Sequence, residues 1–138
     1  MDNKALNYLS LARKAGLAEL GEEPVGAAAR AGKAYLILVA QDASDHTWRR
    51  ARSFAAGTEQ QVLRLRQSKD ELGQSIGRES LAIAAITDAA LALAMVKALE
   101  PSEAAAQVKS VLETKAARIA KRAQEAKAHQ RNVRKGKK

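Results

Sequence analysis

The sequence contains no cysteine, only two prolines and few aromatic side chains, and these shortages exclude several classes of protein. Without cysteine there is no disulfide framework, no thiolate zinc site and no cysteine nucleophile. Alanine supplies 31 residues and aromatic residues make up only 3% of the chain, so most apolar side chains bury little area. No apolar run reaches the roughly 18 residues that a membrane-spanning helix needs. Residues 1–4 lead into an amphipathic pattern without the apolar stretch of a signal peptide, so we expect a cytoplasmic protein that does not bind membranes.

Positive charge is concentrated in the last quarter of the chain. The 138 residues carry a net charge of +9, which predicts a polyanionic partner. Residues 1–100 contain 13 basic and 12 acidic side chains, whereas residues 101–138 contain 11 basic and 3 acidic ones. We therefore predict a nearly neutral globular domain over residues 1–100 and a basic, alanine-rich helical tail over residues 101–138. The last residues, 131–138, are predicted to be disordered.

Helical and strand patterns alternate along residues 1–100. Apolar residues at helical spacing predict five helices, over 3–14, 22–31, 45–56, 69–77 and 89–99. Ser44, Ser68 and Asp88 are predicted to cap the last three of these helices, Ser68 in a capping box with Glu71. Apolar or alternating runs predict four strands, over 17–20, 35–40, 61–66 and 81–87. This alternation predicts an α/β protein, a three-layer αβα sandwich with a small mixed four-stranded sheet and a C-terminal basic helical tail.

No group of residues has the spacing that catalysis or metal binding needs. A phosphate-binding loop has four residues between its glycines, whereas five separate Gly26 from Gly32. Asp42, Asp45 and His46 resemble a metal cluster, but adjacent residues on a helix point about 100° apart. We therefore expect a protein that is not an enzyme and has no metal, no cofactor and no small-molecule substrate.

One predicted helix carries an aromatic ring next to guanidinium groups. Thr47, Ala51 and Phe54 share the face expected to pack on the core, which leaves Trp48 and Arg52 stacked at its border with solvent. Two interpretations stay open. The pair is either an aromatic and basic surface for RNA, or part of a solvated charged face with Trp48 half-buried.

The tail combines a narrow apolar stripe with basic residues on its other faces. The stripe is formed by Ala105, Val108, Leu112, Ala116, Ile119 and Ala123. A basic helix of this type suits the neutralisation of phosphates, and it lacks the aromatic anchors that membrane binding needs. The other interpretation is a solubilising extension.

Several segments together resemble a known family. Residues 20–44, with the spacing from Gly21 to Gly32 intact, residues 68–77, residues 83–88 and the opening 9–16 are similar to the kink-turn-binding ribosomal proteins of L-seven-Ae and L-thirty-e type. The bacterial YlxQ-like branch resembles the chain most. The resemblance covers about residues 3–99 and implies an αβα sandwich with a mixed four-stranded sheet, which agrees with the alternation of elements.

The resemblance implies RNA binding without catalysis, at the start of the second helix and at a later loop near the fourth strand. The family's helix start is typically Gly-x-Asn-Glu-x-x-Lys. Gly21 matches it, while Glu23, Pro24 and Ala27 replace the three polar residues. The candidate RNA-binding residues are Gly21, Glu22, Glu23, Gln41, Asp42, Gly77, Arg78, Glu79 and Ser80. The candidate electrostatic contacts to RNA are Arg49, Arg52, Lys115, Arg118, Lys121 and Arg122.

The function expected from these observations is that of a monomeric bacterial RNA-binding protein. Its partner would be structured, kink-turn-like RNA of ribosomal or regulatory origin. The main alternative is a protein–protein adaptor on the same fold. It is favoured because the three polar residues of the family's helix start are replaced and because this helix start is acidic. A third possibility is the recognition half of an RNA-modifying enzyme, which requires a partner chain. The salt dependence of binding distinguishes the RNA-binding protein from the adaptor, because RNA binding weakens steeply as the salt concentration rises.

Overall fold

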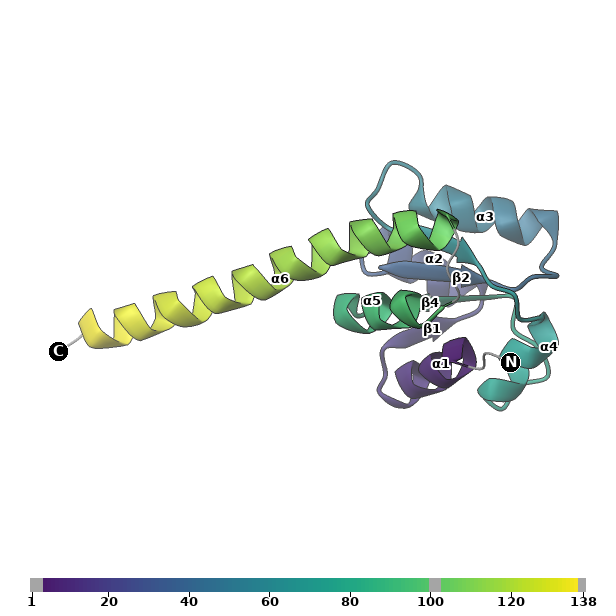
Figure 1. Cartoon of the computed structure of the whole chain (residues 1–138), viewed down its shortest axis with the longest axis horizontal. Coiled ribbons are helices and arrows are strands. Elements are labelled where there is room, and N and C mark those ends of the chain that lie inside the picture. Colours follow the sequence, from purple (N-terminus) through teal and green to yellow (C-terminus); the bar gives the residue numbers. More distant parts are fainter. Residues whose placement is uncertain (1–3, 100–102, 137–138) are drawn as a thin grey trace.

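The alternation of helices and strands is confirmed by the computed structural model, which describes residues 4–99 and 103–136. The elements run along the chain in the order α1 (Lys4–Lys14), β1 (Ala18–Leu20), α2 (Glu22–Arg30), β2 (Leu36–Val39), α3 (Asp45–Ala55), β3 (Gln61–Arg64), α4 (Lys69–Ser75), β4 (Ile83–Ile86), α5 (Ala89–Ala98) and α6 (Glu103–Gly136) (Figure 1). Each strand is shorter than predicted, because the outer residues of each run belong to the adjoining loops.

The four strands form one mixed sheet in the order β1-β4-β2-β3. Strands β2 and β3 are parallel, and β4 is antiparallel to both β1 and β2. In this register Val39, the last residue of β2, lies opposite both Ile83 and Arg64. The carboxyl ends of β1, β2 and β3 therefore meet the beginning of β4 at one end of the sheet. We call this end, with the segments that follow β1, β2 and β3 and precede β4, the loop end.

Helices α2 and α3 cover one face of the sheet (Figure 1). Val25 and Ala29 of α2 and Ala51 of α3 pack against the β2 residues Ile37 and Val39. All five of these side chains are buried. Most of them are small, so this layer packs close to the sheet and contributes less apolar area than larger side chains would.

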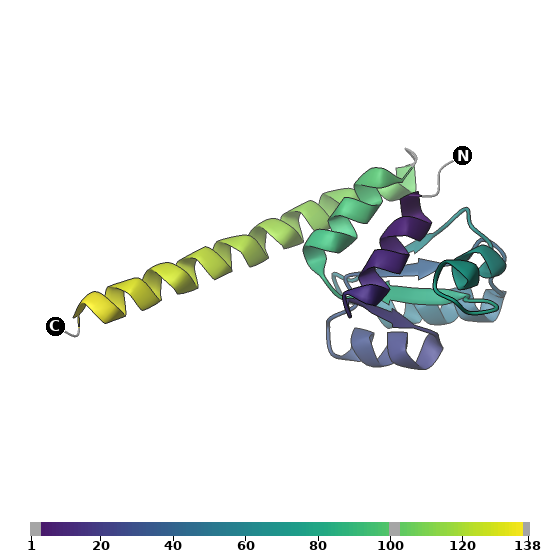
Figure 2. The same ribbon diagram turned by 90° about the horizontal axis from the view of Figure 1, so that it is seen from below.

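Helices α1, α4 and α5 cover the other face, and the start of α6 joins them (Figure 2). Leu9, Leu72, Met95 and Leu112 each come from a different one of these helices and are almost fully buried. They belong to the same apolar cluster as Leu36 and other residues of the sheet. The three-layer αβα sandwich expected from the sequence is thus observed.

Helix α6 begins on the domain and then projects away from it (Figures 1 and 2). Ala105, Val108 and Leu112 are buried in the cluster with α5 and the sheet. From residue 117 to residue 129 every side chain is exposed. The predicted boundary after residue 100 lies outside the described residues, and the packing of Leu112 shows that the tail helix docks on the domain.

The end of α6 differs from the expectation of disorder over residues 131–138. The helix continues to Gly136, because the preceding alanine, lysine, arginine and glutamine residues favour helix and no proline interrupts them. Residues 137 and 138 lie outside the described part of the chain.

The predicted helix caps are confirmed. The Oγ atom of Ser44 accepts a hydrogen bond from the backbone N–H of Thr47 at 3.2 Å. Ser68 and Glu71 form a capping box at the start of α4. The Oδ2 atom of Asp88 accepts from the backbone N–H of Leu91 at 2.8 Å. These caps fix where α3, α4 and α5 begin, and α3 and α4 begin at the loop end.

Candidate nucleic-acid interface

Backbone hydrogen bonds hold the segments of the loop end together. The N–H of Gly21 donates to the carbonyl oxygen of Ile83 at 3.0 Å, which ties the start of α2 to the start of β4. The N–H of Ala40 donates to the carbonyl oxygen of Ala82 at 2.9 Å. The structure therefore brings the predicted segments 21–23, 41–42 and 77–80 to the same end of the sheet.

Gly21 gives the loop end an open, donor-rich corner. Its φ of 96° lies in the region that favours glycine. The nearest atom to a Cβ placed on it is the Cδ of Pro24, at 3.8 Å, so the outward side of Gly21 faces open space. No side chain caps α2, which leaves backbone N–H groups in its first turn to bind an acceptor.

The two acidic residues of this helix start have different surroundings. The carboxylate of Glu22 is held by α3: its Oε1 accepts from the Oγ1 of Thr47 at 3.4 Å, and its Oε2 lies 3.6 Å from the Nε of Arg50. Glu23 is exposed. Glu22 thus joins α2 to α3, and Glu23 is the predicted acid that a ligand can reach.

Gln41 and Asp42 connect the end of β2 to the segment before α4. The Oδ1 atom of Asp42 accepts from the N–H of Lys69 at 2.8 Å, so Asp42 positions the start of α4. The N–H of Gln41 donates to the carbonyl oxygen of Gln67 at 2.9 Å. The side chain of Gln41 is exposed, so it can face a ligand while its backbone holds the loop.

The predicted loop 77–80 is anchored to the end of α4. Gly77 has a φ of 75°, and the N–H of Arg78 donates to the carbonyl oxygen of Gly73 at 2.8 Å. The side chains of Arg78, Glu79 and Ser80 are exposed. The hydroxyl of Ser80 and the guanidinium of Arg78 are therefore available as donors at the loop end.

Sequence reasoning missed Gly73 as the residue that sets the position of this loop. A Cβ on Gly73 would lie 2.6 Å from both the Cα and the N of Ser80, closer than real Cβ contacts come. Only glycine therefore lets the loop cross α4 here. The signal in the sequence was a glycine within a predicted helix, where glycine is usually unfavourable.

The predicted electrostatic residues lie on the helices α3 and α6. Arg49 and Arg52 are exposed on α3, and Lys121 and Arg122 are exposed on the projecting part of α6. Lys115 and Arg118 also lie on α6, where they bind the carboxylate of Glu59 in the turn before β3 at 3.1 and 3.2 Å. These hydrogen bonds lower the pKa of Glu59 below its ordinary value. The structure thus divides the predicted electrostatic residues between α3, which begins at the loop end, and α6.

Trp48 lies at the border of α3 and β3. Thr47 and Ala51 are buried, as the helical spacing predicted, and Trp48 is half-buried against the core. The guanidinium carbon of Arg64 lies 4.5 Å from the centre of the Trp48 ring. Arg64 was not among the predicted residues, because its partner is far from it in the sequence.

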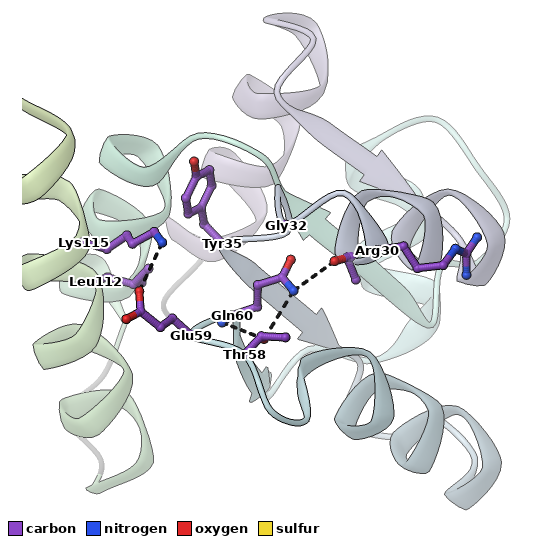
Figure 3. Close-up of a pocket in the computed structure, with 9 residues that line it drawn as sticks. Arg30, Gly32, Tyr35, Thr58, Glu59, Gln60, Leu112 and Lys115 are labelled. Atoms are coloured by element: carbon purple, nitrogen blue, oxygen red, sulfur yellow. Dashed lines mark hydrogen bonds and ion pairs between the residues drawn. The ribbon is translucent and has the colours of Figure 1, made fainter. Parts of the chain in front are cut away.

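A cavity of about 320 Å³ lies at the opposite end of the sheet, between α2, the turn before β3 and α6 (Figure 3). Its buried polar residue, Gln60, donates from Nε2 to the carbonyl oxygen of Ala29 at 3.1 Å and accepts at Oε1 from the N–H of Ala34 at 2.9 Å. Glu59 on its rim binds Lys115. The polar groups of this cavity hold elements of the domain together, and none of the predicted RNA-binding residues at the loop end lines it.

Among residues 4–99 and 103–136, no three His, Asp or Glu side chains are grouped so that they could hold a metal ion. No helix in that part of the chain combines the length and the apolarity needed to cross a bilayer.

Comparisons with known proteins show the fold. No protein-family model and no curated protein matches the sequence. A protein of unknown function from Bacillus halodurans has a similar structure, with a TM-score of 0.63 and 24% identity over 68% of this chain and 94% of that one. A 15.5 kD RNA-binding protein from Giardia lamblia is also similar, with a TM-score of 0.54 and 18% identity over 78% of this chain and 87% of that one. At these identities the likeness establishes a shared fold and supports the fold implied by the family resemblance.

Proposed function

We propose that the chain is a non-catalytic RNA-binding protein that grips structured RNA at the loop end. The observation that carries this proposal is the convergence of Gly21 with the exposed loop 77–80, through the hydrogen bond from Gly21 to Ile83. Both were singled out from the sequence, and they are separated by more than fifty residues along the chain. The similarity of the fold to the Giardia lamblia RNA-binding protein supports the same conclusion.

The chemistry of the loop end favours bases over phosphates. Backbone N–H groups at the start of α2, together with Arg78 and Ser80, provide donors, and the carboxylate of Glu23 provides acceptors. A carboxylate repels phosphates but accepts hydrogen bonds from base amino groups such as that of guanine. Bases become accessible where RNA strands are unpaired or sharply bent. A kink-turn-like internal loop of ribosomal or regulatory RNA is therefore the partner that we propose.

Attraction to the phosphate backbone comes from other parts of the molecule. Lys121 and Arg122 are exposed on the projecting part of α6. Such cations bind phosphates with little regard to sequence. The proposal thus assigns specificity to the loop end and much of the affinity to α6, in a bacterial cytoplasmic protein that acts as a monomer.

A specific observation favours the adaptor as a second candidate. Besides Glu23, the carboxylates of Asp45, Asp70 and Glu79 are exposed on segments that border the loop end. A basic segment of another protein would complement this charge. The two candidates differ in the ligand that the loop end recognises.

The experiment is a titration of the full chain against two fluorescent RNAs of equal length, one with a bent internal loop and one a straight duplex. We expect tighter binding of the bent RNA, with an affinity that falls steeply as salt rises. Equal affinities for the bent RNA and the straight duplex would refute kink-turn-like recognition. A lack of binding to either RNA would favour the adaptor, whose partner could then be captured with the acidic loop end as bait and a Glu23→Lys variant as control.

A further inference from the structure

The edge strand β3 turns two kinds of side chain to opposite faces of the sheet. Leu63 is buried in the cluster that contains the start of α6. Val62 packs in the other cluster, under α3, and Arg64 follows it on the same face because side chains alternate along a strand. Arg64 is exposed and lies at the free edge of the sheet, since β3 pairs only with β2 in the described sheet.

Trp48 holds the guanidinium of Arg64 in place. The distance of 4.5 Å from the guanidinium carbon to the ring centre is typical of a cation–π contact. A guanidinium stacked on a ring keeps its N–H donors in a fixed plane, and that fork matches two oxygens of a phosphate. Because Arg64 covers the ring and Trp48 is half-buried, this surface suits a phosphate better than a stacked base.

Helix α3 adds two more cations on the same side. Arg52 lies one helical turn after Trp48, so these two share a face. Arg49 lies one turn before Arg52, on its outer side and about 100° around the helix from Trp48. Arg50 points elsewhere, because it pairs with Glu22 and lies 5.3 Å from the ring centre of Phe54. Arg50 is therefore occupied, whereas Arg49 and Arg52 are exposed.

Within the described residues, no carboxylate oxygen lies within 4.0 Å of a guanidinium nitrogen of Arg49, Arg52 or Arg64. This contrasts with Lys115 and Arg118, which Glu59 neutralises in part. We refer to Trp48, Arg49, Arg52 and Arg64 as the β3 strip. It runs beside β3 from the loop end, where Arg64 lies opposite Val39, toward the turn where Glu59 binds α6.

We propose that the β3 strip is a second RNA-binding surface, which takes the phosphate backbone of an RNA strand running from the loop end toward α6. This inference rests on the proposed RNA binding and adds a path for the backbone. The loop end and the basic part of α6 lie toward opposite ends of β3. Along this path the strip supplies cations that have no carboxylate partner among the described residues. A strand that leaves the loop end along this path meets the cations of the strip before it reaches those of α6.

The test uses the full chain, because Trp48 is the only tryptophan and reports directly on the strip. The probe is the bent RNA with a single-stranded extension of about twelve uridines. We expect bound RNA to protect the fluorescence of Trp48 from acrylamide quenching. The double variant Arg52→Ala with Arg64→Ala should reduce the slope of log affinity against log salt by about 1.5, since each lost phosphate contact removes about 0.7–0.9.

The matched control is Arg13→Ala with Lys14→Ala, which removes the same charge from exposed residues at the end of α1, on the other face of the sheet. We expect this control to keep the wild-type slope within about half a unit. Equal decreases of the salt slope in the two double variants would refute RNA binding at the β3 strip. Acrylamide quenching of Trp48 that does not change when RNA binds would refute it too. Either result would leave the proposed function intact. If the wild-type protein binds no RNA, the proposed function fails, and the strip fails with it.

Discussion

Gly73 and Ser80 lie so close together that a Cβ on Gly73 would come within 2.6 Å of the Cα and the N of Ser80. Gly73 is in α4 and Ser80 is in the loop before β4, so this contact sets the position of the loop against the helix. The loop carries Arg78, which we propose as a donor to RNA. The buried Gly73 thus sets the position of the exposed loop 77–80, although it is not part of that loop.

Substitution of Gly73 by alanine is expected to displace the loop 77–80. The clash involves backbone atoms, so the loop or α4 must move, at a cost of about 1–3 kcal/mol in the free energy of unfolding. We expect Gly73→Ala to lower the discrimination between bent and straight RNA while its salt dependence stays as in the wild type. Thermal unfolding and RNA titration of the same preparation measure both effects, and an unchanged discrimination would count against the role of the loop.

The start of α6 is expected to contribute to the stability of the domain. Leu112 is 1% exposed, and loss of a buried leucine side chain costs about 2–5 kcal/mol. Residues 1–100 are predicted to fold alone, and removal of α6 uncovers the apolar cluster around Leu63. We expect a chain truncated after Arg118 to melt near the temperature of the full chain, and a chain truncated after Glu100 to melt cooperatively at a lower temperature. Equal melting temperatures would show that α6 covers no essential surface.

The acid titration of Glu59 is expected to report on the contact between α6 and the domain. Hydrogen bonds from Lys115 and Arg118 lower the pKa of Glu59, so the charged carboxylate is favoured in the folded protein. The contact therefore contributes above the ordinary pKa of a glutamate and is lost as the pH falls through the lowered value. An NMR titration of the side-chain carboxyl carbon should show this lowered pKa in the wild type. In the variant Lys115→Ala with Arg118→Ala it should return toward the ordinary value, and a pKa that does not move would refute the assigned cause.

Specificity and affinity are expected to separate in two variants. Gly21 has a φ of 96°, so Gly21→Val is strained and also obstructs the open corner of the loop end. We expect it to erase the preference for bent RNA and to keep the salt slope. Removal of residues 119–138 should weaken all RNAs by a similar factor and flatten the salt dependence. The reverse pattern would place the reading site on α6.

Much of the fold could be predicted because its signals are local. The apolar run around Ile37 marks a buried strand, and Ser44, Ser68 and Asp88 mark helix starts through bonds to residues three positions away. The end of α6 at Gly136 has no such local signal, since neither a capping residue nor a proline marks it in the preceding sequence.

The candidate site was predictable only in part. Gly21 and the loop 77–80 could be named from the family resemblance, but the bond that joins Gly21 to Ile83 depends on the order of the strands. The stacking of Arg64 on Trp48 required knowledge of which helix covers the edge strand. The bond from Lys69 to Asp42 likewise joins segments that are distant in sequence. Such contacts arise from packing and leave no local pattern.

The most direct test of the RNA site compares glycine amides at the two ends of the sheet. Gly21 and Gly77 lie at the loop end, whereas Gly16 and Gly32 lie in the turns before β1 and β2, and all four have a positive φ. A ¹H–¹⁵N NMR titration of the full chain with the bent RNA measures the shift of each amide. We expect Gly21 and Gly77 to shift as RNA is added and Gly16 and Gly32 to stay in place. Shifts at Gly16 and Gly32 with none at Gly21 and Gly77 would contradict RNA binding at the loop end.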